Sequence, residues 1–139
     1  MYDSREEMMI KMVDELRKEQ NHFEVLTDEE YFNSDYGIRR RQRNQTCSNV
    51  VYMHCLVPGV EKNLFGVYFH KRDIAIATPM LFEAFETGIS VERTVKYTYE
   101  RPFLEFRVIR KHSEELYEDT KLLVLELMKY AYENHLYHV

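Results

Sequence analysis

Glycine-rich loops and cysteine motifs are both missing from this sequence, and tryptophan does not occur at all. The four glycines, at positions 37, 59, 66 and 88, are scattered, so no loop offers the consecutive backbone N–H groups that cradle a phosphate. The two cysteines, Cys47 and Cys55, belong to no metal-binding or redox motif. We therefore expect reduced thiols and a cytoplasmic location.

Long apolar runs are also absent. The stretch 122–128 is far too short to span a membrane, and the charged, amphipathic N-terminus does not resemble a secretory signal. The net charge of −5 argues against wholesale binding of nucleic acid but is compatible with a local basic patch. No linker, repeat or low-complexity tract divides the 139 residues, which predicts one domain over 1–139.

The clearest pattern present is a hairpin over residues 91–109. Val95 and Tyr97 alternate with Thr94 and Lys96, which is typical of an antiparallel strand with one wet face. A turn at Pro102 leads into residues 103–109, in which three apolar residues are predicted to face the core: Leu104, Phe106 and Val108.

Two helices with apolar stripes enclose the rest of the chain. Asp3 or Ser4 is a candidate cap for a first helix that ends near Gln20, and the stripe of this helix consists of Met8, Met9, Met12, Val13 and Leu16. The final helix, residues 114–136, has one stripe of Leu116, Leu123, Leu127 and Ala131 and a second stripe of Leu122, Leu125 and Tyr132. A helix that is apolar around so much of its girth is usually buried on two sides, by the sheet and by another helix or another subunit.

Between these helices, the pattern predicts strands at 49–57, 64–70 and 73–77, with a further short strand near 23–26. Thr78 and Pro79 favour the start of a short middle helix, which Gly88 closes. The predicted fold class is therefore α+β. It comprises an antiparallel sheet of about five strands with an N-terminal helix, a short middle helix and a long C-terminal helix, mostly on one face.

This order of elements resembles the fold of type III secretion chaperones. The resemblance covers roughly residues 49–136 and the first helix, and it rests on element order and size. It implies a small acidic homodimer in the cytoplasm that holds unfolded segments of other proteins. No family binding residue is transferred, because no motif matches, and the segment 27–45 is longer and more basic than the pattern of that family.

The densest positive charge is the arginine cluster Arg39, Arg40, Arg41 and Arg43. Guanidinium groups suit phosphate or carboxylate recognition, so one interpretation is contact with a nucleic-acid backbone and another is an acidic protein partner. The remaining alternative is a solvated segment that pairs with the chain's own acids. We predict that residues 34–45 are poorly packed in the free protein and become ordered on binding an anionic partner.

Catalytic and metal-binding patterns are weak. His54 and Cys55 are neighbours on a predicted strand, so their side chains face opposite ways and do not form a nucleophile–base pair. His135 and His138 have too few neighbouring ligands for a metal site. We therefore assign no catalytic residue, no metal and no cofactor, and we lean against an enzyme.

The leading hypothesis is a non-enzymatic protein-binding, adaptor or chaperone-like protein that forms a homodimer and does not bind a membrane. The predicted dimer or partner face consists of Met8, Met12, Leu122, Leu125 and Tyr132. The first alternative is a small nucleic-acid-associated regulatory protein that uses the arginine cluster. The second is an enzyme whose site is dispersed over the sheet.

Overall fold

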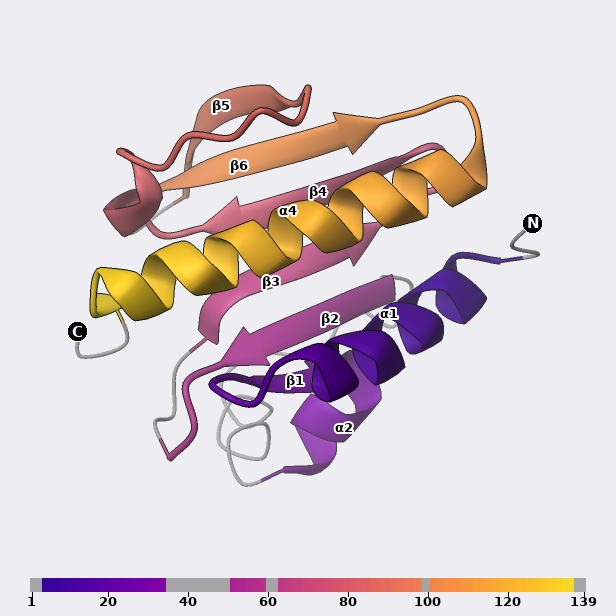
Figure 1. Cartoon of the computed structure of the whole chain (residues 1–139), viewed down its shortest axis with the longest axis horizontal. Helices are drawn as coiled ribbons and strands as arrows, with labels where there is room; N and C mark the ends of the chain where they lie inside the picture. Colours follow the sequence, from indigo (N-terminus) through magenta and orange to yellow (C-terminus); the bar gives the residue numbers. More distant parts are fainter. Residues whose placement is uncertain (1–3, 35–50, 60–62, 99–100, 137–139) are drawn as a thin grey trace.

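Among the residues that the structure describes, six antiparallel strands form one open sheet in the order β1-β2-β3-β4-β6-β5 (Figure 1). The computed structural model describes residues 4–34, 51–59, 63–98 and 101–136. The elements in chain order are α1 (Arg5–Glu19), β1 (Glu24–Thr27), α2 (Asp28–Asn33), β2 (Val51–Leu56), β3 (Asn63–Phe69), β4 (Asp73–Thr78), η1 (Met80–Phe82), β5 (Glu92–Tyr97), β6 (Pro102–Ile109) and α4 (Ser113–Glu133). This architecture confirms the predicted α+β class with its N-terminal and C-terminal helices.

Two elements differ in detail from the prediction. The strand near 23–26 exists as β1 and pairs with β2, so the sheet has six strands instead of about five. The middle helix is only the single 3₁₀ turn η1. The hydroxyl of Thr78, the expected helix cap, instead donates a hydrogen bond to the carbonyl of Leu104 at 3.0 Å, and the turn has no side-chain cap.

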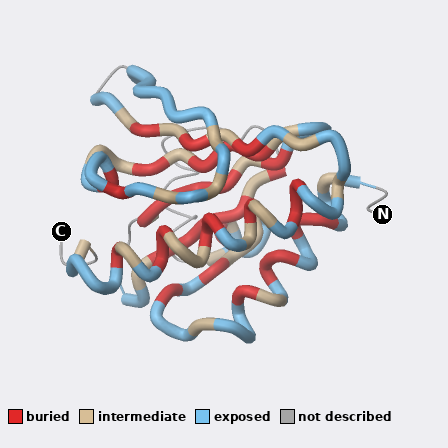
Figure 2. The backbone as a smooth tube through the Cα atoms, turned by 45° about the horizontal axis from the view of Figure 1, so that its top comes forward, coloured by how far each residue is buried: buried red, intermediate tan, exposed pale blue. Residues whose placement is uncertain are grey.

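The core lies between the inner face of the sheet and the two long helices, and Figure 2 shows buried residues recurring along both of these helices. In the register of β4 and β6, Ile76 lies opposite Phe106, so large apolar side chains meet on this face. The prediction of a shared core is confirmed, because six residues are each at most 2% exposed: Leu104, Phe106, Val108, Leu123, Leu127 and Ala131.

α1 and α4 lie side by side on the inner face, as Figure 1 shows. Ser4 caps α1, since its Oγ accepts a hydrogen bond from the N–H of Glu7 at 3.1 Å. The hydroxyl of Tyr117 on α4 donates to a carboxylate oxygen of Glu15 on α1. Lys121 follows one turn later, with its Nζ 3.2 Å from Glu19 Oε1. The first half of α4 is therefore covered by α1 within the same chain.

On the outer face of the sheet, α2 covers the β1–β2 end. Tyr31 of α2 stacks on the ring of His54 at a centroid distance of 3.8 Å. The neighbouring ring of Tyr52 lies over Gly66 of β3, where an added Cβ would be 1.9 Å from the tyrosine oxygen. A side chain at this position would have to displace the ring of Tyr52, which stacks on Tyr68.

None of the helices in the described ranges has an apolar stretch long enough to cross a membrane.

Candidate protein-binding groove on the C-terminal helix

α4 is longer than α1 and continues past its end, as Figure 1 shows. α1 ends at Glu19, and the chain then passes through Gln20 to Phe23 before entering β1. Gln20 fixes this connection, because its side-chain amide donates to the carbonyl of Phe23 at 3.1 Å and accepts from the N–H of Phe23 at 2.9 Å. The second half of α4 is therefore flanked by a short, hydrogen-bonded connection instead of a helix.

A cavity of about 190 Å³ opens at this place, between the connection and α4. We call it the α4 groove, and its lining residues are Gln20, His22, Phe23, Leu125, Met128, Lys129, Tyr132 and Glu133. The floor is apolar, since Phe23 and Met128 belong to the buried core. Glutamine, histidine, lysine and glutamate provide polar groups around it.

Tyr132 and His22 form one wall of the groove. Their rings stack at a centroid distance of 3.9 Å with an angle of 24° between the ring planes. This contact joins the connection after α1 to the last turns of α4. Because an aromatic ring has few rotatable bonds, a stacked pair gives the wall a defined shape in the free protein.

Apolar side chains of α4 continue from the groove onto the open surface. Leu122 is 51% exposed and Tyr132 is 44% exposed. Leu125 lies between them and is half-buried. The spacing Leu122, Leu125, Lys129 and Tyr132 follows the helical repeat, so these residues form one stripe.

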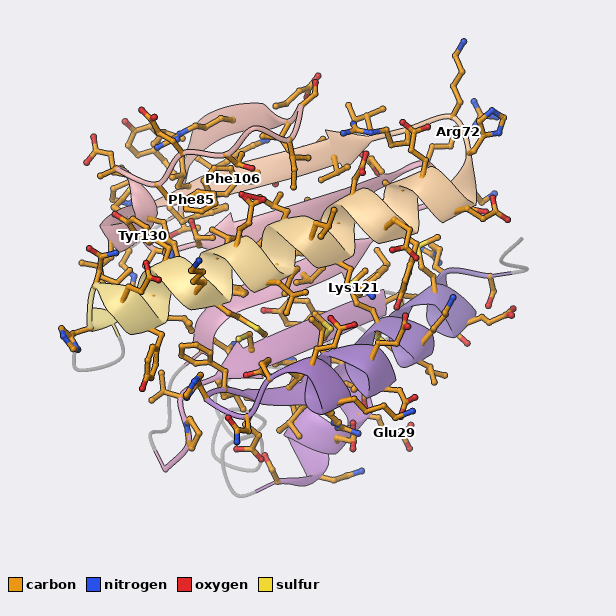
Figure 3. The ribbon with its side chains drawn as sticks, in the orientation of Figure 1. Glu29, Arg72, Phe85, Phe106, Lys121 and Tyr130 are labelled. Atoms are coloured by element: carbon orange, nitrogen blue, oxygen red, sulfur yellow. The ribbon has the colours of Figure 1, made fainter. Side chains whose placement is uncertain are left out.

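Charge at the α1 end of this stripe is provided by Lys121, which Figure 3 shows between α4 and α1. Burial lowers the pKa of Lys121, but the hydrogen bond and charge of Glu19, together with the charges of Glu15 and Glu118, raise it further than burial lowers it. The ammonium group therefore stays charged and engaged with α1. It marks the point at which α1 stops covering α4.

The predicted partner-face residues divide between two places. Leu125 and Tyr132 line the α4 groove, and Leu122 is exposed beside it. Met8 and Met12 are 5% and 0% exposed within this chain, so they belong to the core beneath α1 and not to an outer face. Their physical role is to fill the space between α1 and the sheet, for which flexible methionine side chains are well suited.

The arginine cluster Arg39, Arg40, Arg41 and Arg43 and most of the predicted segment 34–45 lie outside the described residues. The sequence pattern does not indicate that Gln20, His22, Lys129 or Glu133 belongs to a site. No periodicity signals them, because the groove depends on where α1 ends relative to α4. The only sequence signal is the apolar stripe on α4 itself.

His54 and Cys55 lie on opposite faces of β2, as predicted. The ring nitrogens of His54 both have partners, with Nε2 2.8 Å from Asp28 Oδ1 and Nδ1 3.3 Å from Asn63 Oδ1. Cys55 is fully buried in the core, and burial raises the pKa of its thiol. Neither group is arranged as a nucleophile or as its base. Within the described ranges, no group of three or more His, Cys, Asp and Glu residues is placed to hold a metal ion.

Comparisons with protein-family models, curated proteins and solved structures find no match to this chain. The resemblance to type III secretion chaperones therefore remains a prediction from element order.

Proposed function

We propose that this chain is a non-enzymatic protein-binding protein, an adaptor whose α4 groove receives one apolar side chain of a partner protein. The observation that carries this proposal is the cavity of about 190 Å³ at the uncovered half of α4. This cavity supports the predicted role of Leu125 and Tyr132. In the proposed partner face, Phe23 and Met128 take the place of Met8 and Met12, which lie in the core.

The size of the cavity favours a side chain over a small molecule. Sites for cofactors and drug-sized ligands usually enclose about 300–1,000 Å³. An apolar cavity of about 150 Å³ accepts a molecule as small as benzene. At about 190 Å³, the α4 groove is suited to a single phenylalanine, leucine or methionine side chain.

The surroundings of the cavity match the anatomy of a binding hot spot. An apolar pocket with a polar margin buries the anchor residue, while nearby polar groups exclude water and pair with the partner. Here the margin includes Lys129 and Glu133, which lie 4.0 Å apart as an exposed i,i+4 pair. Leu122 extends the apolar surface beyond the pocket.

Selection from a phage-displayed library of random peptides tests this proposal on the whole protein. Selected peptides, resynthesised with a fluorescent label, are expected to share one apolar anchor residue and to bind in a fluorescence anisotropy titration. Leu125→Asp places a charge in the groove and is expected to weaken binding by about tenfold or more. The matched control is Leu81→Asp, because Leu81 is 43% exposed on η1, outside the residues that line the groove.

Binding that is equally strong in the Leu125→Asp and wild-type proteins, with both folded by circular dichroism, contradicts the proposal. Salt provides a second measurement. Apolar anchoring is expected to keep its affinity as salt rises, whereas contacts to phosphate weaken steeply. A steep loss would favour the alternative of nucleic-acid binding through the arginine cluster, which no observation on the described residues supports.

A further inference from the structure

β5 forms an open edge of the sheet. All six of its residues are exposed, and β6 is the only strand that pairs with it among the described residues. In Figure 1, β5 is the uppermost strand, and no other described strand lies beyond it. A row of unpaired N–H and C=O groups on such an edge is a template for a further strand.

Glu92 and Lys96 carry opposite charges and lie two positions before and two positions after Thr94 in β5. Glu92, Thr94 and Lys96 share the outer face, opposite Arg107, Glu105 and Phe103 of β6. Glu92 forms no ion pair with another described residue. Lys96 is 3.8 Å from Glu105, a carboxylate that already pairs with Arg107 at 3.3 Å. Both end charges of the outer row are therefore available to a partner.

We propose that β5 pairs in antiparallel fashion with β5 of a second copy of this chain, about a two-fold axis at Thr94. In this register Glu92 lies opposite Lys96 of the other copy, and the same pair is repeated on the other side of the axis. Thr94 lies opposite Thr94. Opposite charges and threonine pairs directly across two strands are stabilising combinations.

The inner face of the strand supports the same axis. Tyr97, which is 80% exposed, lies opposite Val91 of the second copy, so the most exposed aromatic ring of this region gains an apolar neighbour. Arg93 does not compete, because its guanidinium donates to the carbonyls of Phe85 and Glu83 in its own chain. An axis at Val95 would instead place Lys96 opposite Thr94 and leave Glu92 without a cation.

The order of these charges favours a second copy over an unrelated strand. An isologous two-fold contact requires a self-complementary surface, and Glu92-Arg93-Thr94-Val95-Lys96 has this property on its outer face. A single pair of short strands buries less surface than a standard interface, so we expect a weak dimer with a dissociation constant in the micromolar range.

Sedimentation equilibrium over about 1–300 μM protein tests the dimer. We expect the wild-type mass to rise from monomer to dimer across this range. Lys96→Glu places a glutamate opposite Glu92 of the other copy on both sides of the axis. We expect this like-charge contact to weaken dimerisation by about tenfold or more. The double variant Glu92→Lys with Lys96→Glu restores the opposite pairs in this register and is expected to recover the wild-type affinity. Lys18→Glu, an equal charge change on the exposed side of α1, is the control.

Disulfide cross-linking tests the axis. Thr94→Cys places the two introduced thiols opposite each other at a Cα separation of about 4.5–5.5 Å, within the range of a disulfide. Val95→Cys places them diagonally at about 7–8 Å, outside that range. We expect the Thr94→Cys variant to form a disulfide between the two copies much faster than the Val95→Cys variant. Peptide mass spectrometry identifies the linked positions.

A monomer mass at every concentration overturns the proposal, as does a dimer that Lys96→Glu does not weaken or one that cross-links faster at position 95. The proposed function of the α4 groove is tested separately from the dimer, because Leu125→Asp alters the groove and is expected to leave the dimer mass unchanged.

Discussion

At one edge of the sheet, β1 is covered by side chains of α1, whereas at the other edge β5 presents all six residues to solvent. The guanidinium of Arg17 donates to the carbonyl of Val25 from Nε at 3.1 Å and from Nη2 at 2.9 Å. The same group pairs with Glu30 of α2 at 2.8 Å. β1 is thus held in place by α1, which precedes it in the chain, and by α2, which follows it.

Local sequence explains why β1 is short. Thr27 ends the strand and at once caps α2, because its hydroxyl accepts from the N–H of Glu30 while the Glu30 carboxylate accepts from the N–H of Thr27. No comparable helix start follows β5 within the described residues. One edge of the sheet is therefore closed by local capping and by Arg17, whereas the other is open to solvent or to a partner.

The first prediction concerns the buried layer beneath the open edge. Phe106 packs edge-on against Phe85 at a centroid distance of 5.6 Å, and Figure 3 shows both rings near Tyr130. Phe106→Ala is expected to lower the free energy of unfolding by about 3–5 kcal/mol, since it removes a core ring. Urea denaturation at low micromolar concentration measures this loss. Tyr97→Ala on the exposed strand is the control, with an expected change below about 0.5 kcal/mol.

A loss below about 1 kcal/mol for Phe106→Ala would show that β6 is not packed into the core through Phe106. Both β5 and β6 would then belong to the loosely packed edge of the sheet.

Sequence patterns predicted most of this sheet because its strands and helices obey simple periods. The alternating pattern of β6 puts Leu104 and Phe106 on one apolar face, and the helical stripe of α4 puts Leu123 and Leu127 on another. These two apolar faces pack against each other. These contacts need no knowledge of loops. The fold class and the shared core therefore followed from the residues alone.

The candidate site was only partly predictable. Leu125 and Tyr132 were identified from helical spacing, but the pocket exists because α1 ends before α4 does. Met8 and Met12 have the same spacing as a partner-binding stripe, and only tertiary packing places them in the core. The pair Thr78–Pro79 indicates where a helical segment starts but not its length, and the segment that follows is a single 3₁₀ turn.

The second prediction compares one truncation at each edge. Val25 of β1 is 2% exposed, whereas Val95 of β5 is 42% exposed. Val25→Ala is expected to lower the free energy of unfolding by about 1.5–2 kcal/mol, because buried methyl groups are lost. Val95→Ala is expected to change it by less than about 0.5 kcal/mol. Equal losses, measured by urea denaturation at low protein concentration, would mean that the two edges are packed alike.

The third prediction isolates the closure of β1. Arg17→Met keeps the apolar stem and removes both hydrogen bonds to the carbonyl of Val25. Because the ion pair with Glu30 is more than two-fifths exposed, the expected loss is modest, about 1 kcal/mol. Amide exchange is expected to speed up in β1 and to stay unchanged in β5. Lys18→Met is the control for removing a charge from the same turn. Unchanged exchange in β1 would show that Arg17 does not close this edge.

The last prediction concerns the hydrogen bond between Tyr117 and Glu15, which holds α1, and with it Arg17, in place. The hydrogen bond from the Tyr117 hydroxyl is the largest cause that lowers the pKa of Glu15, ahead of the raising effect of burial, while the charges of Lys121 and Lys11 lower it further. A carboxyl group whose pKa is depressed by folding stabilises the protein above its unfolded pKa, about 4.3. That stability is lost as the pH falls through the lower, folded value. Tyr117→Phe is therefore expected to cost about 0.5–1 kcal/mol at pH 7, and the difference from wild type should shrink once the pH falls below about 4.3. Urea denaturation as a function of pH measures this, and Tyr130→Phe is the control for loss of a hydroxyl. A cost that is the same at neutral pH and at a pH well below about 4.3 would indicate lost packing of the Tyr117 side chain instead of a lost hydrogen bond to an ionised Glu15.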